Sequence, residues 1–168
     1  FLVGVDRSRP HFGIKASWEQ LAMLYRWNIP AMFGTCRIIF IQRRNVLRQA
    51  VSLSIAHQTH KWSSRQTGNG AMPIYDAKAI ADIMQSIERA NAMMSRLCEA
   101  LGLHYTTLYY EDLLRDPNGT VQQKLLEVGV DCTPLSLAEP AIRRQSDHVN
   151  EDYVTRMRTY LRDDLGVP

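Results

Sequence analysis

The sequence predicts an α/β fold built on a parallel sheet. Two short runs, 37–42 and 104–110, are rich in β-branched and aromatic residues and have the composition of buried strands. Between them, segments 45–58 and 76–101 carry apolar residues at helical spacing. Alternating strands and helices are typical of parallel sheets, because parallel strands need a crossover connection that is usually helical.

Length and composition describe one ordinary globular domain, which we expect to span residues 1–168. A chain of 168 residues with 45% hydrophobic and 22% charged residues can bury a core of its own. The net charge of +3 is too small for the dense basic face of a nucleic-acid binder. No apolar run approaches the ~20 residues of a membrane span, and no signal peptide is visible. We therefore expect a cytoplasmic protein that binds no nucleic acid.

Cysteine spacing predicts neither a disulfide framework nor a metal centre. Cys36, Cys98 and Cys132 are widely separated and form no Cys-x-x-Cys pair. The histidines show no ligand spacing either. Reduced cysteines in a metal-free protein are the interpretation that fits this pattern.

Local signals set the boundaries of the remaining elements. Ser17 followed by Gln20 predicts a capping box that opens a helix through about residue 28. Asn45 and Asp76 are candidate N-caps of the two crossover helices, and Gly102 fits a helix stop. Further expected elements are a short strand at 12–15 and helices at 111–114, 117–128 and 150–165.

The junction after the first strand is the most informative stretch, because Arg43 and Arg44 lie there. In open α/β sheets, ligands bind at the carboxyl ends of strands, and a helix N-terminus presents free N–H groups. Arginine adds charge and paired donors to such a place. The junction therefore predicts a site for phosphate or sulfate.

Spacing and charge context support an anion site. Arg44, Arg48 and Ser52 recur every four residues and drift only about 40° per step around a helix, so we expect them on one face. No Asp or Glu occurs between Glu19 and Asp76. Such a window favours anions.

These residues resemble a known family. The strand, Arg44, and Ser52 eight residues later are similar to the 3′-phosphate-binding segment of sulfotransferases that use 3′-phosphoadenosine 5′-phosphosulfate. Residues 43–53 with 57–62 resemble more closely the bacterial trehalose sulfotransferase-type family. Other similar fragments follow in the family's order and span nearly the whole chain, namely 12–18, 110–117 and 144–150.

The resemblance implies a fold and a reaction. The fold would be a P-loop-NTPase-like three-layer α/β fold with a central parallel sheet, incomplete at the N-terminus. The chain would be the C-terminal part of a larger catalytic domain. The reaction would move a sulfuryl group from 3′-phosphoadenosine 5′-phosphosulfate to a hydroxyl of a carbohydrate or glycolipid, without a metal. We expect a small-molecule or glycolipid acceptor as partner and leave a homodimer open.

The resemblance also assigns donor-binding residues. Arg44 and Ser52 would hold the 3′-phosphate, and Arg144 and Gln145 would reach back to the donor. Arg48 would add a cation on the helix face that it shares with Arg44 and Ser52. A surface salt bridge is an equal alternative for Arg48.

The loop after segment 45–58 carries the expected acceptor contact. Trp62 would offer a platform on which a sugar stacks. His60 and Lys61 are candidates for acid–base chemistry, but an exposed loop is the favoured interpretation, and the family more commonly has glycine where His60 stands. Glu111 and Asp112 open a helix after the second strand, and we interpret them as structural.

No catalytic residue is assigned. The family cradles the donor's 5′-phosphosulfate in a loop akin to a P-loop and takes its base from a glutamate in the same N-terminal portion. No Gly-rich phosphate loop occurs in this sequence, and no position matches that glutamate.

Two other functions stay open at the level of sequence. A nucleotide-dependent kinase of related fold would carry a Gly-x-x-x-x-Gly-Lys-Ser/Thr loop upstream of the first strand. A non-catalytic domain would use its arginines to bind an acidic partner, and would not prefer 3′-phosphorylated nucleotides.

Overall fold

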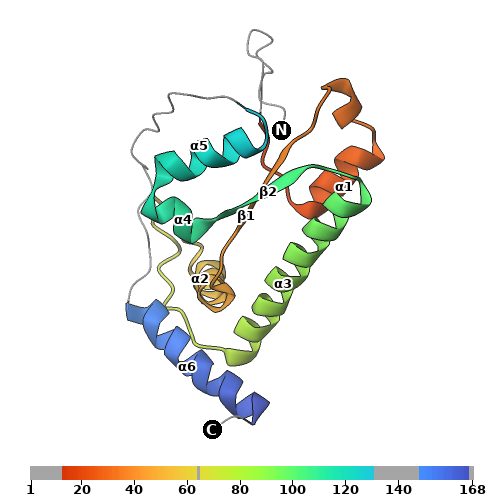
Figure 1. Ribbon diagram of the computed structural model, residues 1–168. Helices are drawn as coiled ribbons and strands as arrows, with labels where there is room; N and C mark the ends of the chain where they lie inside the picture. The colour runs from red at the N-terminus through yellow and green to blue at the C-terminus, as the bar shows by residue number, and fades with distance from the viewer. Residues whose placement is uncertain (1–12, 64, 131–147, 167–168) are drawn as a thin grey trace.

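The computed structural model describes residues 13–63, 65–130 and 148–166, and it has a mixed α/β fold (Figure 1). Its elements in chain order are α1 (Trp18–Arg26), the 3-10 turn η1 (Pro30–Met32), β1 (Ile38–Gln42), α2 (Val46–Thr59), α3 (Ala77–Ala100), β2 (Tyr105–Tyr109), α4 (Tyr110–Arg115), α5 (Pro117–Glu127) and α6 (His148–Leu165). The predicted fold class is confirmed.

β1 and β2 are parallel neighbours, as the sequence predicted. Their register runs from Ile38 beside Tyr105 to Gln42 beside Tyr109, so both strands end at the same edge. The crossover between them consists of α2 and α3. Among the described residues the sheet has these two strands, and Ile41 of β1 is 63% exposed. The short strand expected at 12–15 is not formed over 13–15, and residue 12 lies outside the described ranges.

Helices cover the strand pair on both sides (Figure 1). α4 and α5 pack on β2, while α2 and α3 lie on the other side and contact each other. The Thr106 hydroxyl donates to the Glu127 carboxylate, which joins β2 to α5. α6 crosses below and packs on α2 and α3. None of these helices, within the described part of the chain, is long and apolar enough to cross a bilayer.

The predicted helix starts at positions 17, 45 and 76 are confirmed. The Ser17 N–H donates to Gln20 Oε1 at 2.8 Å, and the Gln20 N–H returns to Ser17 Oγ at 3.4 Å. Asn45 Oδ1 accepts from the Arg48 N–H, and Asp76 caps α3 in the same way. After α3, Gly102 takes a φ of +61°, the left-handed conformation that lets the chain leave a helix.

Two buried clusters form the core. The first joins α2, α3 and α6, and the second joins α1, β1 and α3. α3 contributes to both because its 24 residues span the molecule. The buried members are Ala50, Val51, Ile80, Tyr153, Val154 and Met157 in the first cluster, and Leu21, Phe40, Met94 and Cys98 in the second.

Candidate functional site

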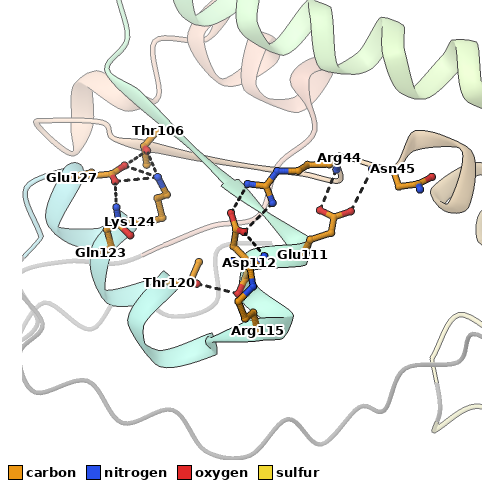
Figure 2. A network of polar contacts seen from close by, with 10 residues as sticks. All are labelled: Arg44, Asn45, Thr106, Glu111, Asp112, Arg115, Thr120, Gln123, Lys124 and Glu127. Carbon is orange, nitrogen blue, oxygen red and sulfur yellow. Dashed lines mark hydrogen bonds and ion pairs between the residues drawn. The ribbon is translucent and has the colours of Figure 1, made fainter.

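The segment that follows β1 lies against the segment that follows β2 (Figure 2). Because Gln42 pairs with Tyr109 at the end of the ladder, Arg43 and Arg44 meet the residues that open α4. We call Arg43, Arg44 and Asn45 the arginine corner. It occupies the carboxyl edge of the sheet, where ligands of parallel α/β proteins bind.

Arg44 is held by an aspartate and a tyrosine. Its Nη1 and Nη2 donate to Asp112 Oδ1 and Oδ2 at 2.9 and 2.7 Å, and its guanidinium carbon lies 4.0 Å from the centroid of the Tyr109 ring. The hydrogen bonds lower the pKa of Asp112 and raise that of Arg44. The Arg44 side chain is still 48% exposed, and this bidentate pair uses two of its five N–H donors.

The Glu111 side chain binds the backbone just before α2. Its two carboxylate oxygens accept the backbone N–H groups of Arg44, at 3.1 Å, and Asn45, at 3.3 Å. Burial raises the pKa of Glu111, but these N–H groups and the Arg44 charge outweigh it and leave the pKa below its ordinary value. The Glu111 carboxylate therefore accepts hydrogen bonds from backbone N–H groups that the sequence predicted would bind a phosphate. This contact is in keeping with a structural role for Glu111.

Arg48 is directed toward α6. Its Nη1 and Nη2 donate to Glu151 Oε1 and Oε2 at 2.5 and 2.7 Å, and this hydrogen bonding raises the pKa of Arg48. The salt bridge considered as an alternative for Arg48 is therefore present. Ser52 lies one turn further along α2 and is exposed, whereas Arg44 precedes the N-cap Asn45 and is not part of the helix.

The window without acids in sequence is not free of acids in space. α4 brings Glu111 and Asp112 to the corner, and α6 brings Glu151 to Arg48. Three carboxylates thus approach a stretch that contains none of its own. Within the described residues, these carboxylates offset part of the positive charge that the linear sequence places in this stretch.

Arg43 differs from its neighbours. Its guanidinium carbon lies 4.1 Å from the centroid of the Tyr110 ring, and the side chain is half-buried. Within the described ranges, no carboxylate is paired with it.

Trp62 lies far from the arginine corner. It follows α2, whose 14 residues separate the two ends by about 20 Å. Trp62 is 54% exposed, and its ring contacts the ring of His57 with centroids 5.1 Å apart. His60 takes a φ of +55° at the end of α2, a left-handed conformation that glycine adopts most easily.

The remaining predicted site residues and the cysteines can be placed only in part. Arg144, Gln145 and Cys132 lie outside the described residues. Cys36 and Cys98 are free thiols. The pKa of Tyr25 is raised to about 12, mainly by burial and to a smaller extent by a hydrogen bond with Cys36. No group of three or more metal-ligating side chains occurs in the part of the chain that the structure covers.

Sequence reasoning missed the partners of the arginines. Tyr109, Tyr110 and Asp112 determine how Arg43 and Arg44 are held. One signal was present: both polar runs directly follow a predicted strand, and parallel strands end at one edge. The register that makes the pairing specific was not predictable from either run alone.

The fold and corner together define a class, an α/β protein whose parallel strands end at an arginine-rich edge. Within that class, the chain belongs to the Stf0 sulphotransferase family, whose model matches residues 9–160. The chain is therefore a sulfotransferase, and the resemblance to the trehalose-type family is confirmed. A search of curated proteins found no match.

Proposed function

We propose that this sulfotransferase takes its sulfuryl group from 3′-phosphoadenosine 5′-phosphosulfate and transfers it to a hydroxyl of a carbohydrate or glycolipid. The observation that carries the proposal is the arginine corner at the carboxyl edge of two parallel strands. Family membership favours this function over a kinase or a non-catalytic binding domain.

Arg44 and Ser52 are proposed to contact the 3′-phosphate. Asp112 and the Tyr109 ring fix the Arg44 guanidinium on one side, which leaves other N–H donors for a ligand. A guanidinium held in advance loses less entropy when it binds a phosphate. The exposed Ser52 hydroxyl adds one donor, and Arg144 and Gln145 would complete the contacts.

Arg48 has a more indirect part in this proposal. Because Glu151 engages both of its terminal nitrogens, we assign it to holding α6 against α2 beside the donor site. Arg48 lies one helical turn before Ser52 on α2.

In the proposed reaction, the acceptor hydroxyl oxygen attacks sulfur, and the bond between sulfur and the 5′-phosphate oxygen breaks. The hydroxyl proton passes to a base, which we do not assign, and adenosine 3′,5′-bisphosphate leaves. Cations stabilise the charge that develops on the leaving bisphosphate. Trp62 would stack on a part of the acceptor remote from the 3′-phosphate, because the length of α2 separates Trp62 from Arg44.

The first test is calorimetric titration with adenosine 3′,5′-bisphosphate, with adenosine 5′-monophosphate as the comparison ligand. We expect tighter binding of the bisphosphate, and we expect Arg44→Ala to weaken it about tenfold or more because a charge-assisted contact to phosphate is lost. Ser52→Ala should weaken it by a smaller factor. Arg89→Ala, at an exposed position on α3, is the matched control.

Equal affinity for the two nucleotides would contradict the proposed donor. Unchanged bisphosphate affinity in both Arg44→Ala and Ser52→Ala would contradict the assignment of the 3′-phosphate. Circular dichroism of each variant separates loss of a contact from loss of the fold.

A further inference from the structure

Arg43 is the cation of the arginine corner whose charge no carboxylate meets within the described ranges. Arg44 is bound by Asp112 at two points, and Arg48 is bound by Glu151 at two points. Arg43 has the Tyr110 ring as its neighbour instead. An anion that reaches the corner therefore meets one arginine already paired, Arg44, and one that is not, Arg43.

The environment of Arg43 favours a bound anion over open solvent. The side chain is half-buried, so part of its hydration has been lost without a carboxylate in return. The Tyr110 ring, whose centroid lies 4.1 Å from the guanidinium carbon, accepts no conventional hydrogen bond, and no other described residue takes one from the Arg43 guanidinium. The edge of the guanidinium plane carries the N–H donors that match phosphate and sulfate oxygens in pairs.

Position strengthens the argument. Arg43 directly follows Gln42, the last residue of β1, and Tyr110 directly follows Tyr109, the last residue of β2. The pair therefore bridges the two strand ends at the edge where parallel α/β proteins bind ligands. Because Arg43 and Arg44 stack on different rings, they present two separate contact points. A ligand with two anionic groups suits such an arrangement.

We propose that Arg43, oriented by Tyr110, binds a phosphate or sulfuryl group of the sulfate donor. The inference rests on the proposed function, since it assumes a nucleotide donor with anionic groups at its 3′ and 5′ positions. It adds a residue that neither the spacing of Arg44 and Ser52 nor their comparison with the family assigns.

The test compares Arg43→Gln with Arg43→Lys, and Arg89→Gln on α3 serves as the matched loss of charge. Each protein is titrated with adenosine 3′,5′-bisphosphate, adenosine 3′-monophosphate and adenosine 5′-monophosphate. Arg43→Gln is expected to bind the bisphosphate about tenfold or more weakly. Arg43→Lys should lose less, because it keeps the charge but not the planar donors. The monophosphate whose affinity falls identifies the group that Arg43 contacts.

Two substitutions of Tyr110 test its orienting part. Tyr110→Phe keeps the ring and should bind the bisphosphate like the unaltered chain, whereas Tyr110→Leu should bind about threefold more weakly, because the stacked guanidinium is released. If both tyrosine variants bind equally well, the orienting role is wrong.

The outcomes separate this inference from the proposed function. If the unaltered chain binds the bisphosphate and Arg43→Gln weakens this binding no more than Arg89→Gln does, the proposed role of Arg43 is wrong. The proposed donor would then still stand. Absence of bisphosphate binding by the unaltered chain would overturn both. Near-ultraviolet circular dichroism shows whether Arg43→Gln folds, and Arg43→Lys retains the test if it does not.

Discussion

Asp112 influences the orientation of Arg44 more than the stability of the protein. The pair is bidentate and charge-assisted, which makes it geometrically specific. Both side chains are substantially exposed, however, and exposed ion pairs contribute little to folding free energy. The Tyr109 ring limits the guanidinium from a second direction. Arg44, which we propose to bind the donor, is thus held from two directions while its side chain stays 48% exposed.

Glu111 and Asp112 give the protein a specific pH dependence. Both carboxyls have a pKa lowered in the folded state, so their stabilisation is present above the ordinary carboxyl pKa of about 4 and is lost as pH falls through the lowered values. We expect the melting temperature to fall when the pH is lowered below about 4. The fall should be less steep in the double variant that carries both Glu111→Gln and Asp112→Asn. Thermal melts from pH 7 to pH 3 measure this. Parallel curves for the two proteins would rule the linkage out.

At the scale of residues, the sequence predicted where the arginines lie but not what holds them. Arg43 and Arg44 follow a strand that is visible in composition alone. Asp112 is 68 positions from Arg44, and only the register of β1 against β2 brings them together. The linear absence of acids therefore overstated the positive charge of the corner.

At the scale of elements, packing fixes α6 more than charge does. Tyr153, Val154 and Met157 are buried against α2 and α3, and the Tyr153 hydroxyl donates to the Pro73 carbonyl at 2.7 Å. The Arg48–Glu151 pair lies at a more exposed place on the same contact. The two kinds of contact make different predictions.

Met157→Ala should lower the free energy of unfolding by about 2–5 kcal/mol, because it leaves a cavity at a fully buried position. Glu151→Gln removes a partly exposed ion pair and should change it by about 1 kcal/mol or less. Urea unfolding monitored by circular dichroism compares the two variants. Similar losses in both would show that charge and packing contribute equally to this interface.

Local chemistry made some elements predictable and left others out of reach. The caps at Ser17, Asn45 and Asp76 depend on residues three positions apart, so sequence placed those starts correctly. A strand needs a neighbour, and apolar composition at 12–15 does not supply one. Residues 13–15 accordingly form no strand.

At the scale of the molecule, α3 joins the two clusters of the core. Ile80, near its start, is fully buried in the first cluster, whereas Met94 and Cys98, near its end, belong to the second. A helix spans 1.5 Å per residue, so one rigid element transmits changes between clusters about 20 Å apart. The two clusters should therefore unfold together.

Ile80→Ala and Leu21→Ala test this coupling from opposite ends. Each should lower the midpoint of one shared unfolding transition, because neither cluster can lose α3 without the other. With Trp27 and Trp62 replaced by phenylalanine, tryptophan fluorescence reports on the second cluster, against which Trp18 packs, and far-ultraviolet circular dichroism reports on all helices. Separate midpoints for the two signals would show that the two clusters unfold independently.

The acids that α4 and α6 bring to Arg44 and Arg48 also bear on how a donor arrives. Seen from more than a Debye length away, roughly 8 Å in physiological salt, the charges of Glu111, Asp112 and Glu151 offset most of the positive charge of the arginines near them, which are Arg43, Arg44, Arg48 and Arg115. A polyanion in solution then feels little long-range attraction, and electrostatic steering adds little to the rate of encounter. Selection happens after collision, when individual donors meet individual oxygens, so the corner discriminates by shape more than by total charge.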